Sequence, residues 1–170
     1  MWDFRGQKRP RFAYQPGEGQ ESVWDYPRPP SIEPDSRLVE VHAGGELIAQ
    51  CNRSLRVCET ASPPTFYIPP EDVAIELLVP VEHRTVCEWK GQASYWALAM
   101  GKLSVPVAWS YLSPFRAFAA IRGWLCFYPG RINCFVDSEL VQSQRSEFYG
   151  GWITTDVVGP FKGDPGTSGW

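Results

Sequence analysis

A thiol and an amine lie three positions apart in one strand-like stretch of the sequence, at Cys87 and Lys90. A cysteine thiolate is a nucleophile, and a lysine ammonium can bind an anionic or a carbonyl group. Successive side chains of a β-strand point to opposite faces, which places Cys87 beside Trp89 and places Lys90 on the other face. The pattern therefore does not favour Cys87 as a nucleophile, because the ammonium that would activate it points away.

Two carboxylates are candidate partners for Lys90. Glu59 ends a short predicted strand, and Asp72 lies at the start of a predicted helix. An enzyme that uses Lys90, with Glu59 or Asp72 as the proton carrier and Cys87 nearby, is one hypothesis. The ordinary alternative for Lys90 is a surface lysine, or a lysine that is ion-paired at a turn.

Aromatic residues are the most unusual part of the composition. The chain of 170 residues has eight Trp, nine Phe and seven Tyr, which make up 14% of it. We interpret some of these rings as a cage, in which aromatic side chains of neighbouring strands surround a flat or cationic small molecule. The alternative is a solid aromatic core that joins two sheets. The candidate ligand-binding residues are Tyr67, Trp89, Lys90, Tyr95, Trp109, Tyr111 and Tyr128.

The cysteine and histidine pattern does not indicate a metal site, and we expect no cofactor. Structural zinc sites usually take ligands from close Cys-x-x-Cys pairs, and the sequence has none. Neither His42 nor His83 is placed as a metal ligand or as a base. The glycine-rich stretch 159–167 is not a phosphate loop, because Gly163 rather than Ser or Thr follows Lys162. We expect reduced thiols at Cys51, Cys58, Cys87, Cys126 and Cys134.

The charge pattern argues against several classes of partner. The net charge of −3 does not favour nucleic acid or an acidic membrane surface. A local basic cluster is ordinary for a solvated tail; it contains Arg5, Lys8, Arg9 and Arg11. No apolar run reaches the roughly 18 residues of a membrane helix, and residues 1–6 lack the apolar stretch of a secretory signal. We therefore expect a cytoplasmic protein without nucleic-acid or membrane partners.

Composition divides the chain into three regions. We expect residues 1–35 to form an extended proline-rich arm and residues 36–140 to form a β-domain. Residues 141–170, rich in glycine and aromatic residues, are expected to fold back on this domain. About ten short strands and two short helices predict a mainly β sandwich or open barrel.

Glycine and proline set the expected boundaries of the elements. One hairpin is expected to turn at Gly44-Gly45 and another at Pro129-Gly130. The first helix is expected to begin at Pro69-Pro70 and the second at Ser113-Pro114. One or two further helical turns are expected within residues 139–148. The expected buried side of the second helix consists of Phe115, Phe118 and Ala119.

A longer string, Thr85–Tyr95, resembles the signature of family 427 of the domains of unknown function. The flanking blocks agree with that family over residues 40–140. They include Cys58-Glu59-Thr60, Pro63-Pro64, Tyr67-Ile68-Pro69, Asp72-Val73, Trp109, Tyr111, Pro114, Gly123 and Phe127-Tyr128. The resemblance implies a β-tent, in which two antiparallel sheets meet at a steep angle. The thalidomide-binding domain of cereblon and the Mss-four-like domains share that architecture.

The resemblance does not imply an activity. Many β-tent proteins hold zinc with two Cys-x-x-Cys pairs, whereas here Lys90 stands where a second cysteine would follow Cys87. A nucleotidyltransferase-like label has been attached to the family, but the sequence has no Gly-Ser…Asp-x-Asp motif that would bind the metal ions of that reaction.

Three hypotheses about function remain. The leading one is a non-enzymatic module that binds a small molecule or a modified side chain in an aromatic pocket. The enzyme that uses Lys90 is the second. The third is a scaffold that docks a protein partner through the proline-rich arm and Gly169-Trp170. The sequence does not indicate an oligomeric state.

Overall fold

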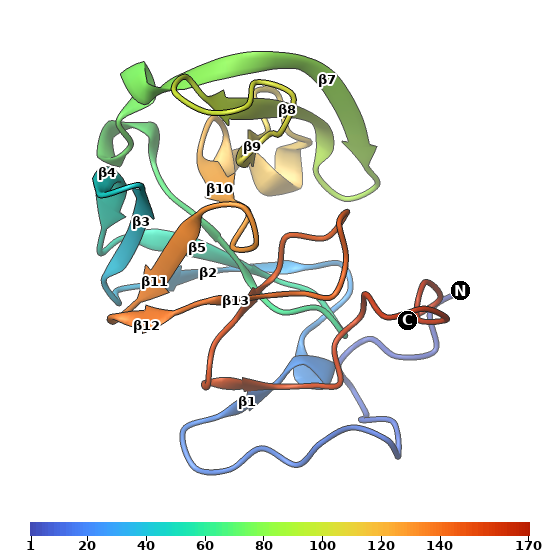
Figure 1. Ribbon diagram of the computed structural model, residues 1–170. Coiled ribbons are helices and arrows are strands. Elements are labelled where there is room, and N and C mark those ends of the chain that lie inside the picture. Colours follow the sequence, from blue (N-terminus) through green and yellow to red (C-terminus); the bar gives the residue numbers. More distant parts are fainter.

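The computed structural model describes residues 1–170 and confirms a mainly β protein (Figure 1). Most strands belong to three antiparallel sheets. The first sheet has the order β10 (Leu125–Phe127), β9 (Ala108–Ser110), β8 (Gly91–Leu98) and β7 (Leu78–Cys87). The second has the order β12 (Glu139–Leu140), β11 (Asn133–Val136), β3 (Val39–Ala43) and β4 (Glu46–Cys51). The third contains β2 (Ser31–Asp35), β5 (Ser54–Cys58) and β6 (Thr65–Tyr67).

Two short ladders and four 3₁₀ helices complete the structure. β13 (Gln142–Ser143) pairs with β14 (Trp152–Ile153), and β1 (Glu21–Ser22) runs parallel to β15 (Val157–Val158). The 3₁₀ helices are η1 (Val23–Asp25), η2 (Pro70–Asp72), η3 (Ile75–Leu77) and η4 (Arg116–Ile121). None of the helices has the length and apolar character to cross a membrane.

The hairpin predicted at Gly44-Gly45 is confirmed, and the one predicted at Pro129-Gly130 is wrong. β3 and β4 flank the first turn, whose two glycines have φ values of 55° and 85°, as a tight hairpin turn favours. In contrast, β10 pairs with β9 and β11 pairs with β3. The Pro129-Gly130 connection therefore carries the chain from the first sheet to the second. Turn residues mark a change of direction but do not determine which strand comes next in the sheet.

The first predicted helix is interrupted after one turn. η2 ends at Asp72 because Val73 forms a β-bridge with Ala49 of β4, which draws the backbone into an extended conformation. The next turn, η3, is separate. Segments this short gain little from helical hydrogen bonds alone, so a pairing to the neighbouring strand prevails.

The second predicted helix also differs from expectation. Phe115, and not Ser113, precedes the first helical residue of η4, and no side chain caps its N-terminus. Phe118 is buried as predicted, but Phe115 and Ala119 are exposed. A 3₁₀ helix has three residues per turn, so its faces differ from those of the α-helix that we expected. The helical turns predicted within 139–148 are also wrong, because β12 and β13 occupy residues 139–143.

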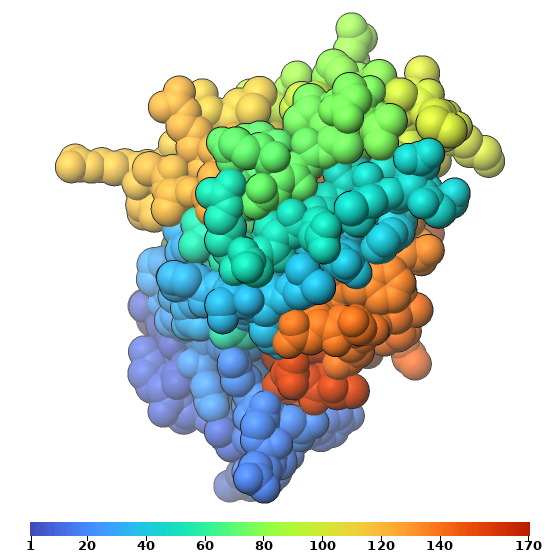
Figure 2. All heavy atoms as spheres, turned by 90° about the vertical axis from the view of Figure 1, so that its left-hand side faces the viewer, coloured from blue at the N-terminus to red at the C-terminus, as the bar shows by residue number.

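The N-terminal residues pack against the C-terminal ones. Trp24 is fully buried, and its indole N–H donates a hydrogen bond to the Pro160 carbonyl (3.1 Å). Three further rings surround the Trp24 ring, those of Phe4, Phe12 and Trp170. Figure 2 shows the N-terminal residues in blue and the C-terminal residues in red meeting at the lower end of the molecule. Most aromatic residues of the proline-rich arm therefore serve internal packing.

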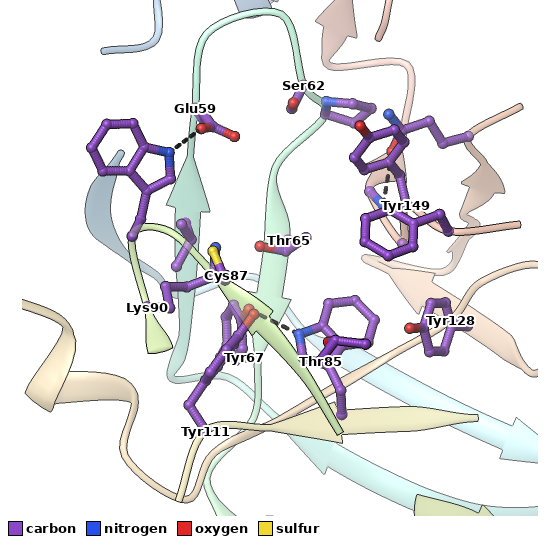
Figure 3. Close-up of a pocket in the computed structure, with 18 of the residues that line it drawn as sticks. Glu59, Ser62, Thr65, Tyr67, Thr85, Cys87, Lys90, Tyr111, Tyr128 and Tyr149 are labelled. Carbon is purple, nitrogen blue, oxygen red and sulfur yellow. Dashed lines mark hydrogen bonds between the residues drawn. The ribbon is translucent and has the colours of Figure 1, made fainter. Parts of the chain in front are cut away.

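Backbone hydrogen bonds join the first and third sheets. The Ile68 amide donates to the Leu125 carbonyl (2.8 Å), and the Leu125 amide donates to the Ile68 carbonyl (2.9 Å). The first sheet lies across the top of Figure 1, with the third sheet below it. The steep angle that a β-tent implies stays a prediction. Residues of both joined sheets line an open cavity (Figure 3).

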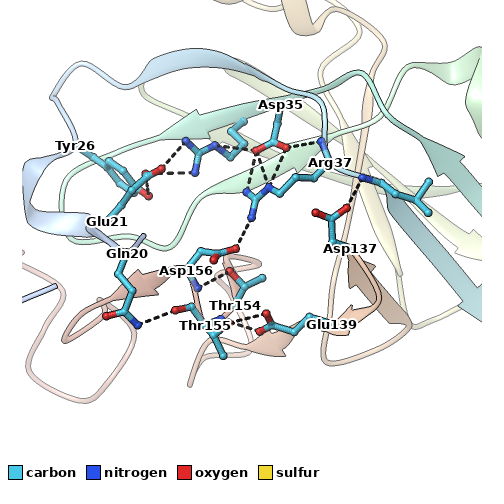
Figure 4. A network of polar contacts seen from close by, with 12 residues as sticks. Gln20, Glu21, Tyr26, Asp35, Arg37, Asp137, Glu139, Thr154, Thr155 and Asp156 are labelled. Atoms are coloured by element: carbon cyan, nitrogen blue, oxygen red, sulfur yellow. Dashed lines mark hydrogen bonds and ion pairs between the residues drawn. The ribbon is translucent and has the colours of Figure 1, made fainter. Parts of the chain in front are cut away.

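A network of arginines and carboxylates ties β2 and β5 to the C-terminal region (Figure 4). Arg37 donates hydrogen bonds to Asp35 (2.8 Å) and to Asp156. Arg56 belongs to β5 and is buried. Its guanidinium lies 3.5 Å from the Asp35 carboxylate and 3.2 Å from the Glu21 carboxylate. Burial by itself would raise the pKa of Asp35, but the hydrogen bonds from Arg37 outweigh it and lower that pKa.

Candidate functional site

An open cavity of about 410 Å³ lies beside the turn that joins β7 to β8. Its volume is in the range of small-molecule pockets, which is roughly 300–1,000 Å³. Residues from five parts of the chain line it: β5 through β6, the β7–β8 hairpin, the end of β9, the residue after β10, and the C-terminal segment (Figure 3). The structure brings together all seven predicted ligand-binding residues, namely Tyr67, Trp89, Lys90, Tyr95, Trp109, Tyr111 and Tyr128.

Aromatic rings form one side of this cavity. Trp109 donates a hydrogen bond from its indole N–H to the Tyr67 hydroxyl (3.1 Å). The Trp109 ring also packs on Tyr128 at a centroid distance of 4.6 Å, and Tyr111 lies 6.4 Å from Tyr67. Burial raises the pKa of the Tyr67, Tyr111 and Tyr128 hydroxyls, so these groups are uncharged at neutral pH. These four residues are at most 9% exposed and belong to the main hydrophobic core, so each contributes only a small, uncharged part of the cavity surface.

A hydrogen bond between two side chains fixes a polar edge of the same surface. The hydroxyls of Thr85 and Tyr95 lie 2.7 Å apart across the β7–β8 hairpin. Thr85 is paired with Ala93 across the two strands, so Tyr95 is its diagonal neighbour, beside the irregularity between Val81 and Arg84.

Lys90 lies in the turn and not in the strand. β7 ends at Cys87 and β8 begins at Gly91, so the alternation of faces stops before Lys90. The predicted placement of Cys87 and Lys90 on opposite faces is therefore wrong: both side chains line the cavity. The Phe115 amide donates a hydrogen bond to the Lys90 carbonyl (3.1 Å), which holds the turn against the segment before η4.

Neither predicted carboxylate is ion-paired with Lys90. Glu59 lines the cavity, but it accepts a hydrogen bond from the Trp89 indole (2.6 Å) and lies 3.9 Å from Arg28. Asp72 does not line the cavity; it binds Arg53 (3.0 Å). Instead, the Lys90 ammonium nitrogen lies over two aromatic rings, 5.6 Å from the centroid of Tyr111 and 5.9 Å from that of Phe118.

Cys87 is the one cysteine that is partly exposed, and all five thiols are free. The others are buried in the protein interior. Burial raises the pKa of the Cys58 thiol to about 12, and it also raises the pKa of Cys126 and Cys134. A buried, protonated thiol is unreactive. Any thiol chemistry in this protein is therefore expected at Cys87.

The C-terminal segment supplies a wall that the sequence analysis missed. The Gln144 side chain accepts a hydrogen bond from the Gly151 amide (3.1 Å) and donates one to the Lys162 carbonyl. Tyr149 and Gly150 also line the cavity. The adjacent glycines at 150 and 151 were the available signal, because close approach of the backbone to a ring requires a residue without a side chain.

The protein has no cluster of side chains that could bind a metal ion: no group of three or more His, Cys, Asp or Glu side chains lies close enough to hold one.

A match to a known protein family decides to which family the chain belongs. The family described as "Domain of unknown function (DUF427)" matches residues 31–141. The chain belongs to the DUF427 family. No curated protein matches the chain.

The DUF427 region and the rest of the chain make different parts of the cavity. The matched residues supply the aromatic side, Cys87 and Lys90. Gln144, Tyr149 and Lys162 lie beyond the match. In this DUF427 protein, the C-terminal wall of the cavity is therefore formed by residues outside the matched region.

Proposed function

We propose that this DUF427 protein is a non-enzymatic module that binds a small molecule, or a modified side chain of another protein, in the aromatic cavity. The observation that carries the proposal is the cavity itself. Trp109, Tyr111 and Tyr128 line a space of about 410 Å³, and the Trp109 and Tyr128 rings pack on each other at a centroid distance of 4.6 Å. Flat rings and an open volume favour a planar ligand, because stacked aromatic surfaces gain both apolar burial and ring–ring contact.

The enzyme alternative has less support. A proton carrier must lie within hydrogen-bond reach of the group that it serves. Asp72 is engaged with Arg53 away from the cavity, and Glu59 is engaged with Trp89 and Arg28. Cys87 and Lys90 alone offer a thiol and an amine without a defined base.

The scaffold alternative is also less favoured. Docking through the arm would require its apolar rings to be available to a partner. The arm instead contributes Trp24 and Tyr26 to a buried cluster, and the Trp170 ring packs on Phe12 at a centroid distance of 5.1 Å. These contacts use much of the apolar surface of the arm, and the exposed aromatic residues that it keeps are Phe12 and Tyr14.

A thermal-shift screen of planar metabolites tests the proposed function. We expect at least one compound to raise the Tm of the wild-type protein, since a ligand at 100 times its Kd stabilises the folded state by about 2.7 kcal/mol. Trp89→Ala should weaken that shift, because Trp89 lines the cavity. Trp124→Ala is the matched control, since Trp124 is also only partly buried and lies outside the cavity. Equal shifts in both variants, or no shift with any compound, would argue against the proposal.

A further inference from the structure

The ionic groups of the cavity are unevenly paired. Two carboxylates and two ammonium groups line it, those of Glu59, Glu88, Lys90 and Lys162. Glu59 lies 3.9 Å from the guanidinium of Arg28, whose side chain is almost completely buried. Glu88 is exposed in the β7–β8 turn and forms no ion pair. Of the two carboxylates, Glu59 alone therefore has a cationic partner, and that partner, Arg28, does not line the cavity.

Neither ammonium group has a carboxylate within ion-pair distance. The Lys90 nitrogen lies over Tyr111 and Phe118, at 5.6 Å and 5.9 Å from the ring centroids. Lys162 is arranged in the same way, over Tyr149 at 5.4 Å and over Trp2 at 5.3 Å. Ring faces attract a cation without cancelling its charge. Together with Arg28, the four groups carry a net charge of +1, and both ammonium groups lack an ion-paired carboxylate.

The two lysines hold different places in the cavity. Lys90 extends from the turn beside Cys87 toward the aromatic side of the cavity. Tyr111 and Thr65 line the same part of the cavity (Figure 3). Lys162 lies on the C-terminal wall, between Tyr149 and the N-terminal Trp2. A ligand that stacks on the rings would meet Lys90 first.

We propose that the cavity selects a planar aromatic carboxylic acid, whose carboxylate binds the Lys90 ammonium while its ring lies among the aromatic residues that line the cavity. This inference rests on the proposed function and names the ligand class for the same site. A single ammonium with neighbouring hydroxyls suits a carboxylate, because it supplies one strong charge-assisted contact. Phosphate sites more often use arginine forks or several backbone amides, and no arginine lines this cavity.

Matched pairs of probes test the proposal by isothermal titration calorimetry. Indole-3-acetate and indole-3-acetamide form one pair, and benzoate and benzamide form another. We expect each acid to bind the wild-type protein at least about tenfold more tightly than its amide, as one charge-assisted hydrogen bond implies. Raising the salt concentration should weaken binding of the acid and leave that of the amide unchanged.

Variants locate the effect. Lys90→Met should abolish the preference for the acid and leave amide binding intact, which also shows that the variant is folded. Lys102→Met is the matched control, since Lys102 is exposed and does not line the cavity. It should retain the preference. If Lys90→Met does not fold, the salt dependence of the wild-type protein still tests whether a positive charge of the cavity carries the preference.

Each other outcome has a defined meaning. Equal affinity for acid and amide, or the same preference in Lys90→Met as in the wild type, would overturn the carboxylate assignment while leaving small-molecule binding in place. Tighter binding of phenyl phosphate than of benzoate would also overturn it, in favour of a phosphate ligand. A failure of every probe in this panel and in the metabolite screen would overturn the proposed function and the assignment together.

Discussion

A methyl group added at Gly150 is the sharpest test of how the C-terminal wall meets the rings. A Cβ atom built at this position would lie 2.5 Å from Trp109 Cη2 and 2.6 Å from Trp109 Cζ3. The Trp109 ring is held in place, because its indole N–H donates a hydrogen bond to the Tyr67 hydroxyl and the ring packs on Tyr128. Gly150→Ala should therefore force either the wall or the ring out of place.

The expected magnitude follows from two opposing effects. Overpacking a fixed contact costs about 1–3 kcal/mol. Replacing glycine by alanine also stabilises by about 0.4–1 kcal/mol through the unfolded chain, where the backbone is compatible. Gly169→Ala isolates this second effect, because a Cβ at Gly169 meets no atom within 4 Å. Gly150→Ala should thus be about 1–3 kcal/mol less stable than Gly169→Ala.

Thermal unfolding and near-UV circular dichroism are the assays. The difference corresponds to a Tm about 2–12 °C lower than that of Gly169→Ala, given about 2–4 °C per kcal/mol at this chain length. The near-UV signal should also change, because Trp109 and Tyr128 lose their fixed geometry. If both variants melt within about 1 °C of each other with identical near-UV spectra, the close packing of the wall on Trp109 is refuted.

Three further predictions address stability and reactivity. Asp35→Asn should lower the free energy of unfolding by about 1–3 kcal/mol at pH 7, since it removes the bonds from Arg37. The folded-state pKa of Asp35 is lowered, so its contribution to the free energy of unfolding is complete above the unfolded pKa of about 3.9 and is lost as the pH falls through the folded pKa. Urea titrations should therefore show a smaller stability difference between wild type and Asp35→Asn at pH 3 than at pH 7. A difference that stays constant would contradict the prediction. Trp152→Ala should cost about 3–5 kcal/mol in urea unfolding, because this fully buried ring belongs to the main core, and a cost below 1 kcal/mol would contradict that placement. Native-state alkylation followed by mass spectrometry should modify Cys87 rapidly and Cys58 only on unfolding; rapid modification of both would be inconsistent with the burial described here.

Local patterns carried much of the fold and of the site. The Gly44-Gly45 turn was predictable, because two adjacent glycines with positive φ are the usual requirement of a tight hairpin. Trp109 and Tyr111 are two residues apart, so strand alternation places both rings on one face, and both line the cavity. These features depend on neighbours within a few residues.

The errors came where long-range pairing decides the outcome. β11 joins β3 across the sheet, which the turn at Pro129-Gly130 does not indicate. The bridge between Val73 and Ala49 ends a helix that local capping residues favour. In the same way, the wall formed by Gly150 depends on contacts with a strand more than thirty residues earlier. A single sequence gives no direct measure of such partners.

The misplacement of Lys90 has a different cause. The alternation that we expected through Thr85–Lys90 is correct only as far as the strand extends. β7 ends at Cys87 and β8 begins at Gly91, so residues 88–90 form the turn between them. Gly91 has a φ of 102°, a backbone conformation that favours glycine. An error of three residues in the end of one strand reversed the predicted relation between the thiol and the amine.

The parallel pairing of β1 with β15 has a consequence for the order in which the protein is made. Glu21 pairs with Val157, so β1 has no partner until residue 157 has been synthesised. In the same way, the Trp24 indole N–H lacks its hydrogen-bond acceptor until Pro160 has been synthesised. Contacts between residues so distant in sequence form slowly, since a large loop must close first. On the ribosome, the aromatic N-terminal segment therefore stays unprotected while the central sheets assemble, and it is the part of the nascent chain that a chaperone would meet.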